Sequence, residues 1–204
     1  FFVSQLSTSA SGAVGVMFSA MSMIQAIGFT LGMGSGNHIS RSLGNRDEER
    51  AGVFAATAFY TAAIIGVGIL AVGTLFSRQL VFFLGATETI APYAQDYARY
   101  ILIGAPFMMT SFVMNNILRS QGNAVFAMVG ITVGGILNMI LDPLLIFGLD
   151  LGISGAAIAT MVSQIISFCI LLYQCNARPD CIKIQLSKFR PSGKVYGEIL
   201  HAGL

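Results

Sequence analysis

Charged residues are scarce in this sequence. Only 10% of its 204 residues are Asp, Glu, Lys or Arg, whereas 55% are hydrophobic and the mean hydropathy is +0.76. A soluble domain usually carries about 25% charged residues, so the composition excludes an ordinary water-solvated domain. The net charge of +2 is too small to indicate a nucleic-acid partner. Apolar stretches of about 20 residues, the length that crosses a bilayer, recur along the chain. We therefore predict an all-α polytopic membrane protein.

Residues that usually build metal, redox and catalytic sites are also few. The cysteines Cys169, Cys175 and Cys181 fit no common zinc or redox spacing, and their odd number argues against a disulfide framework. The two histidines, His38 and His201, lie far apart in the sequence. No Ser/His/Asp or Cys/His set falls within the apolar spans. We therefore expect neither an enzyme nor a bound cofactor.

The beginning of the sequence lacks the features of a signal peptide. Phe1 is not an initiating Met, and no basic segment precedes the apolar residues. The last residues, 198–204, have the composition of the beginning of another apolar segment. We expect the chain to be part of a longer protein.

Five apolar segments are long enough to cross a membrane. We predict spans at about 12–36, 51–75, 98–118, 125–148 and 153–175. The connections between them are short and contain helix-capping or helix-breaking residues. Because Thr87-Glu88 is followed by Pro92, we also predict a short interfacial helix from Thr87 to Tyr100, leading into the third span.

The basic residues are distributed unevenly between the connections. Nine of the eleven Lys and Arg lie after the first, third and fifth spans, whereas Arg78 and Arg99 lie on the opposite side. Cytoplasmic loops of membrane proteins carry the excess of Lys and Arg. We therefore predict a multi-pass protein of the cell membrane, with the connections after the odd-numbered spans in the cytoplasm.

Small residues recur at the spacing of helix contacts. Gly28 and Gly32 form one GxxxG pair, and Gly130 and Gly134 form another. Such pairs allow transmembrane helices to approach closely. They predict a tightly packed bundle.

Asp142 is the only acidic residue that the sequence places deep inside an apolar span. A charge there is unfavourable by about 2.5–3.5 kcal/mol on insertion scales, so we expect Asp142 to bind a proton, a cation or a charged substrate. Asn138 lies one turn earlier on the same helix face. Pro143 lacks an N–H and is expected to kink the helix near Met139. Together Asn138 and Asp142 offer an amide and a carboxylate oxygen to Na⁺; the alternative is a structural Asp bonded to a neighbouring helix.

Thr160, in the next span, is predicted to lie at a similar depth, because a short loop joins the two antiparallel helices. Its hydroxyl would complete the site, unless it bonds only to its own helical turn. Other residues within the spans are candidates for lining a substrate cavity, with helix–helix or lipid contacts as the alternative: Gln25, Asn115, Asn116, Gln164, Met139 and Met161.

Segments along the whole chain resemble the multidrug and toxic compound extrusion (MATE) family. Residues 39–48 and 119–123 resemble the first two cytoplasmic loops of the family. Residues 138–148 resemble its fifth transmembrane helix, and residues 152–160 resemble the start of its sixth.

The resemblance implies a twelve-helix transporter of two six-helix lobes, of which this chain would be the N-terminal lobe, with helices two to six present and helix one nearly absent. Residues 1–175 would form this lobe, residues 176–197 a cytoplasmic inter-lobe linker, and residues 198–204 the start of the C-terminal lobe.

The resemblance also implies a function. Family members are alternating-access antiporters, coupled to Na⁺ or H⁺, that export amphipathic, often cationic drugs and toxins. The family's cation site falls on Asn138, Asp142 and Thr160, with a further acidic residue expected just before Phe1. The expected partners are these substrates, the lipid bilayer and the C-terminal lobe. The alternatives are a lipid-linked oligosaccharide flippase, disfavoured because no Lys or Arg lies deep in a span, and a non-transporting membrane scaffold.

Overall fold

The computed structural model describes residues 3, 7–177 and 181–203. Five long helices dominate this part of the chain: α1 (Thr8–Gly44), α2 (Glu48–Leu75), α4 (Ala91–Ser120), α5 (Ala124–Pro143) and α6 (Gly152–Ala177). Between and after them lie α3 (Ser77–Phe83), the π-helical turn η2 (Leu144–Gly148), the 3-10 turn η3 (Leu186–Lys188) and α7 (Gly193–Gly203). Five helical segments, with α5 and η2 counted as one, are long and apolar enough to cross a membrane. The predicted all-α polytopic fold is confirmed.

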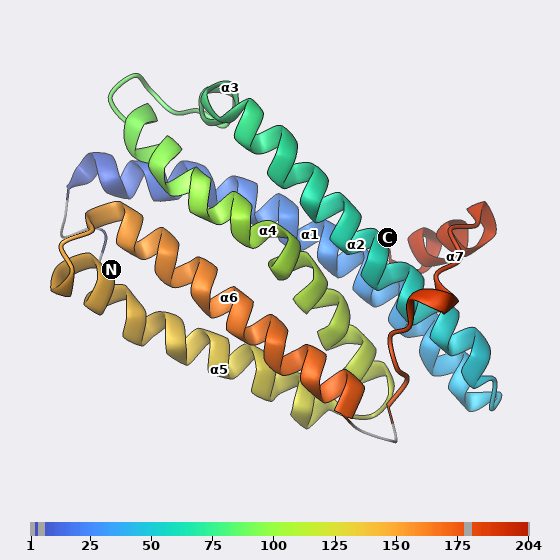
Figure 1. The fold of residues 1–204 in the computed structure, drawn as a ribbon. Helices are drawn as coiled ribbons and strands as arrows, with labels where there is room; N and C mark the ends of the chain where they lie inside the picture. Colours follow the sequence, from blue (N-terminus) through green and yellow to red (C-terminus); the bar gives the residue numbers. More distant parts are fainter. Residues whose placement is uncertain (1–2, 4–6, 178–180, 204) are drawn as a thin grey trace.

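The central helix of the bundle is α4, which contacts α1, α2, α5 and α6 (Figure 1). Its most apolar stretch is 72% buried, although its hydropathy is the lowest of the five spans. The helix continues through Pro106 without interruption. At that level α2 approaches closely, because a Cβ added to Gly66 would lie 2.5 Å from Pro106 Cα.

The third span begins earlier than predicted, and the separate interfacial helix from Thr87 to Tyr100 is wrong. The α4 helix begins at Ala91, whose N–H donates to Thr87 O at 2.8 Å. Pro92 lies in its first turn, where backbone N–H groups have no acceptor within the helix, so the N–H that proline lacks costs no hydrogen bond. The short helix of this region is instead α3 (Ser77–Phe83), which precedes the turn.

The glycine pairs lie at close helix contacts, as predicted. A Cβ added to Gly28 on α1 would lie 3.3 Å from the Met109 backbone on α4. On α5, an added Cβ at Gly130 would lie 2.5 Å from the Leu171 side chain of α6. The Ser167 hydroxyl of α6 donates to Gly130 O at 2.9 Å, which joins the two helices at this point.

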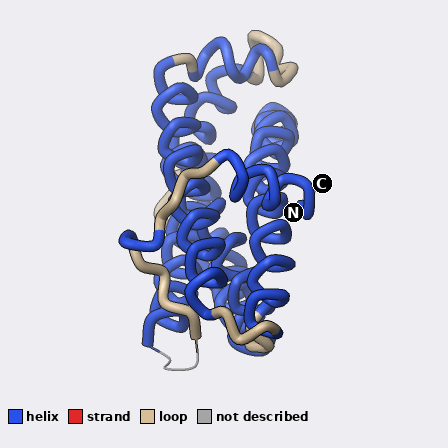
Figure 2. Tube along the Cα trace, turned by 90° about the vertical axis from the view of Figure 1, so that its right-hand side faces the viewer, coloured by secondary structure: helices blue, strands red, loops and turns tan. Residues whose placement is uncertain are grey.

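The segment 181–190 packs on the bundle and does not extend away from it (Figure 2). Ile182 N donates to Gln121 Oε1 at 2.8 Å, beside the turn between α4 and α5, and η3 contacts α2. The Thr57 hydroxyl accepts from Arg190 N at 3.4 Å and donates to Arg190 O at 3.5 Å. The rings of Tyr60 and Phe189 meet at 5.6 Å between centroids. Within the predicted linker, Phe189 and Arg190 are therefore attached to α2 at neighbouring helical turns.

The α7 helix packs against α1, at the end of the bundle that the basic residues predict to be cytoplasmic (Figure 1). It begins at Gly193 and runs through residue 198 without a break. No change in secondary structure marks the predicted start of a second lobe at this residue. The division into 1–175, 176–197 and 198–204 stays a prediction.

Candidate functional site

Asn138, Asp142 and Thr160 lie together between α5 and α6. The Asn138 Nδ2 donates to Thr160 Oγ1 at 3.3 Å and to Asp142 Oδ1 at 3.5 Å. Thr160 Oγ1 in turn donates to Ala156 O, one turn earlier in α6, at 3.0 Å. The four-residue spacing places Asn138 and Asp142 on one face of α5, and the antiparallel α6 brings Thr160 to the same level.

The three side chains offer several oxygens to a ligand. The Asn138 amide oxygen and the second Asp142 carboxylate oxygen have no hydrogen-bond partner among the described residues. Carboxylate, amide and hydroxyl oxygens are the ligands that hard cations prefer, and a carboxylate also accepts a proton. All three residues are partly exposed, so an ion can reach them. Chemically, the arrangement suits reversible binding of one small cation or a proton.

Tyr97 is a further member of this cluster that the sequence did not indicate. It is buried on α4, only 5% exposed, and its side chain neighbours both Thr160 and Asp142. Because the third span was predicted to begin at residue 98, Tyr97 was assigned to the predicted interfacial helix that precedes it. The available signal was a Tyr, with its polar hydroxyl, next to the predicted start of the third span. The cluster therefore joins α4 to α5 and α6.

The helix changes its geometry at Pro143, where a kink was predicted. The α5 helix keeps α geometry through Met139 and Asp142 up to Pro143. Beyond it, the wider π turn η2 begins, in which Leu149 N donates to Leu144 O at 3.1 Å. The departure from α geometry thus lies directly after Pro143, and the kink itself stays a prediction. π turns in helices often occur at functional sites, and this one begins two residues after the Asp142 carboxylate.

A cavity of about 280 Å³ lies beside the cluster, between α1, α4, α5 and α6. The hydroxyls of Ser111 and Ser163 line it, and both are buried without a hydrogen-bond partner among the described residues. Buried polar groups in proteins usually have partners, so these two are available to water or to a polar ligand. The other lining residues are Met21, Phe112, Ile131, Gly134, Gly135, Asn138, Thr160, Gln164 and Ser167.

Of the six residues predicted to line a substrate cavity, only Gln164 lines this one. Asn115 instead joins two helices, because its Nδ2 donates to Ala127 O of α5 at 2.8 Å. Asn116 donates to Phe112 O within α4 at 2.9 Å and lines a separate hollow of about 300 Å³. The separation arises because neighbouring positions on a helix point about 100° apart.

The other three candidates also lie outside the cavity lining. Met139 is 69% exposed on α5. Met161 lies beside Gly104 of α4, where an added Cβ would be 3.7 Å from the Met161 Cα. Gln25 on α1 is partly exposed.

Comparisons with known proteins identify related sequences and structures. The MatE family model matches residues 1–144. The chain is 28% identical to the multidrug export protein MepA of Staphylococcus saprophyticus, over 94% of this chain and 42% of that protein. It is 36% identical to the FAD transporter of Shewanella oneidensis, over 85% of this chain and 39% of that protein.

A solved structure of a multidrug resistance MATE family transporter of the MOP superfamily, in its inward-facing conformation, superimposes with a TM-score of 0.92 and 33% sequence identity. The match covers 99% of this chain and 46% of that protein. The chain thus spans less than half the length of the proteins that it matches. The fold that it shares with them is that of one lobe.

Proposed function

This chain belongs to the MATE family of transporters, and from that membership we propose that it is the N-terminal lobe of an ion-coupled antiporter that exports amphipathic, often cationic drugs and toxins. It is a multi-pass membrane protein. The proposed location is the cell membrane, with the Lys- and Arg-rich end in the cytoplasm. The second lobe of the same protein, the bilayer and the exported molecules are its proposed partners.

The observation that carries the proposal is the contact of Asn138 with both Asp142 and Thr160 at the edge of the cavity. A carboxylate within a span is unfavourable unless it is paired or used. In this lobe Asp142 has no ion-pair partner among the described residues. A coupling cation, Na⁺ or H⁺, supplies the missing charge.

The proposed coupling follows from competition for the Asp142 carboxylate. With the carboxylate charged and free, the cavity favours a cationic substrate. When Na⁺ binds to the oxygens of Asp142, Asn138 and Thr160, or when Asp142 is protonated, that attraction is lost and the substrate is released. The π turn η2, directly after Pro143, is the element through which a change at Asp142 would alter the end of the helix.

The lining of the cavity supports an uncharged or cationic substrate. It combines apolar side chains, such as Met21 and Phe112, with hydroxyl and amide groups, and no Lys or Arg belongs to it among the described residues. Its volume of about 280 Å³ is close to the lower end of the range for small-molecule pockets, roughly 300–1,000 Å³. Recognition of a phosphate group normally uses Arg or Lys. This lining therefore disfavours a lipid-linked oligosaccharide flippase.

The test is efflux of a fluorescent amphipathic cation from cells that express the full-length protein, with Na⁺ present and with Na⁺ absent. We expect efflux that depends on one of the two ions and is lost when Asp142 is replaced by Asn, because the amide cannot carry the charge. Thr160→Val removes the hydroxyl but keeps the shape of the side chain. It should lower the affinity for the coupling ion, so that efflux needs a higher ion concentration but is retained when the ion is saturating.

Two results would contradict the proposal. Efflux and ion dependence that are unchanged in the Asp142→Asn variant would remove this carboxylate from the coupling mechanism. Absence of export for any amphipathic cation would favour the flippase or the non-transporting scaffold.

A further inference from the structure

The α7 helix lies unusually close to α1, because glycines remove the side chains at their contact. A Cβ added to Gly34 on α1 would collide with the backbone carbonyl of Ile199, and one added to Gly203 on α7 would collide with the carbonyl of Thr30. The Asn37 Nδ2 donates to Ala202 O at 3.2 Å. Because backbone atoms of the two helices are in direct contact, α7 has one defined position on α1, which we call its seat.

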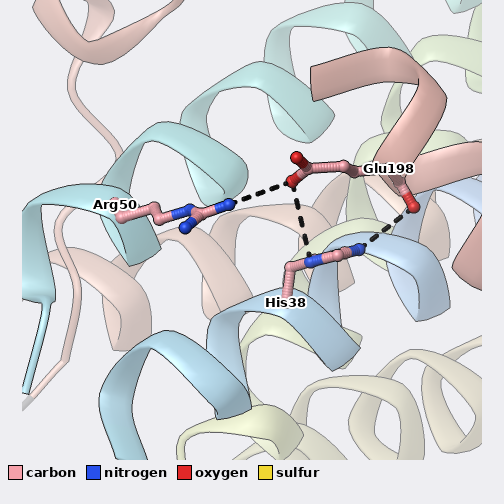
Figure 3. Close-up of polar contacts among 3 residues, drawn as sticks. All are labelled: His38, Arg50 and Glu198. Atoms are coloured by element: carbon pink, nitrogen blue, oxygen red, sulfur yellow. Dashed lines mark hydrogen bonds and ion pairs between the residues drawn. The ribbon is translucent and has the colours of Figure 1, made fainter. Parts of the chain in front are cut away.

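Three side chains from three helices meet at the edge of this seat (Figure 3). The Glu198 carboxylate of α7 lies 3.4 Å from the Arg50 guanidinium of α2 and 3.9 Å from His38 Nδ1 of α1. His38 Nε2 lies 3.1 Å from the backbone oxygen of Glu198. The His38 side chain is 18% exposed, whereas Arg50 and Glu198 are 58% and 39% exposed. The imidazole is therefore the most protected part of this cluster, which we name the cytoplasmic clasp.

The two ring nitrogens of His38 both face acceptors. A backbone carbonyl can only accept, so Nε2 must carry a hydrogen to bond with the oxygen of Glu198. In a neutral imidazole the other nitrogen, Nδ1, then has a lone pair that faces the Glu198 carboxylate, and two acceptors repel each other. When Nδ1 is also protonated, the same geometry becomes an attraction between an imidazolium and a carboxylate.

Aromatic and charged groups surround the ring. The Phe54 ring stacks on the imidazole at 4.7 Å and 16°, and an aromatic face attracts a cation. The cavity at this position, about 450 Å³, contains two cationic groups, Arg41 of α1 and Arg50 of α2. It also contains two acidic groups, Asp47 of α2 and Glu198 of α7. Cationic and acidic groups are equal in number here, and the Glu198 carboxylate is the acidic group that faces Nδ1 at 3.9 Å.

We propose that His38, Arg50 and Glu198 form a proton-sensitive clasp that fastens α7 to α1 and α2 and tightens when His38 is protonated. Histidine is the side chain whose charge changes near neutral pH. Acidification of the cytoplasm would therefore hold the segment after the linker more firmly on this lobe. Its consequence for transport, a slower opening of the cytoplasmic side, rests on the proposed function; the clasp itself does not.

The test measures the distance between α1 and α7 in the full-length protein. Spin labels at Gly44→Cys and Gly197→Cys are suitable, because a Cβ at either glycine meets no atom within 4 Å. The native cysteines of this protein, Cys169, Cys175 and Cys181 among them, are replaced by Ala. Between about pH 8 and pH 6 we expect the population at the short distance to rise about twofold or more. The increase should be lost in His38→Gln, whose amide can still donate to the Glu198 carbonyl but does not titrate.

A second background separates the clasp from the coupling site. The same measurement is made with Asp142→Asn, which removes the proposed coupling charge on α5, at the opposite end of the bundle from the clasp. A pH response that survives Asp142→Asn but is absent in His38→Gln supports the clasp, whatever the transport assays show. A response that persists in His38→Gln overturns it, and so does one that is lost in Asp142→Asn. If His38→Gln does not fold, Glu198→Gln serves instead, because it removes the carboxylate that the imidazolium requires.

Discussion

The helices α4 and α5 both cross the membrane, but they differ in what surrounds them. The α5 span has the highest hydropathy of the five, and only 17% of its most apolar stretch is buried, whereas α4 has the lowest and is 72% buried. Lipid is as apolar as Leu, so hydropathy does not draw a helix into the interior of a membrane protein. The comparison teaches that α4 holds the lobe together by packing, while α5 carries the polar site on an otherwise exposed helix.

The largest difference between the two helices should appear in the free energy of unfolding when a Met on each is replaced by Ala. Met109 on α4 is fully buried, whereas Met128 on α5 is 66% exposed. We expect Met109→Ala to lower the free energy of unfolding by about 2–4 kcal/mol, because it leaves a cavity. Met128→Ala should change it by less than about 0.5 kcal/mol. Unfolding of the full-length protein in mixed micelles measures both, and equal losses would contradict the comparison.

A smaller effect is expected from crowding the contact between α2 and α4. A Cβ at Gly66 would lie 2.5 Å from the Pro106 backbone, which cannot move aside as a side chain can. Gly66→Ala should therefore destabilise the protein by about 1–3 kcal/mol. Gly68 on the same helix has no atom within 4 Å of an added Cβ and provides the matched control. Thermal unfolding of the two variants, each against the parent protein, would show whether α4 tolerates a closer neighbour.

The hydrogen bond that joins α4 to α5 should contribute less again. Asn115 donates across to Ala127 O, whereas the adjacent Asn116 donates to Phe112 O of its own helix. We expect Asn115→Ala to lower the free energy of unfolding by about 1 kcal/mol. Asn116→Ala should change it by less, because the hydrogen bond that it removes lies within α4 and does not join two helices. The reverse order in the same unfolding assay would mean that the two helices are held together in another way.

The smallest change in stability is expected at the polar site on α5. Asp142→Asn keeps the shape of the side chain and an oxygen that Asn138 can donate to, so the free energy of unfolding should change by less than about 0.5 kcal/mol. Efflux by the same variant should nevertheless be lost. Measuring unfolding and efflux on one preparation sharpens the comparison: α4 variants that still fold should transport, whereas this α5 variant should fold and not transport.

Much of the fold could be predicted from the sequence, because a membrane span is a local property. Each span can be recognised from its own segment and the residues that flank it: about twenty apolar residues, a capping residue and the flanking Lys and Arg. The approach of Asn138, Asp142 and Thr160 was predictable for a similar reason. Two of them share a helix face, and a short loop fixes the third.

What the sequence did not indicate depends on contacts between distant segments. Tyr97 reaches Thr160 only because α4 begins at Ala91 and packs against α6. The seat of α7 depends on Gly34 meeting Ile199, which are far apart in the sequence. The hydrogen bond of Asn115 to Ala127 O was not evident for the same reason, since the sequence shows that the side chain is polar but not which helix it meets.

The attachment of Phe189 and Arg190 to α2 has a mechanical consequence. A flexible linker can move without affecting the helices that it joins. Here Arg190 and Phe189 are bound to Thr57 and Tyr60 of α2, and the Tyr196 hydroxyl meets Thr61 at 3.0 Å, so this part of the chain cannot move independently of α2 while these contacts hold. A displacement of α7 away from the bundle would therefore have to break these contacts with α2 as well as those with α1.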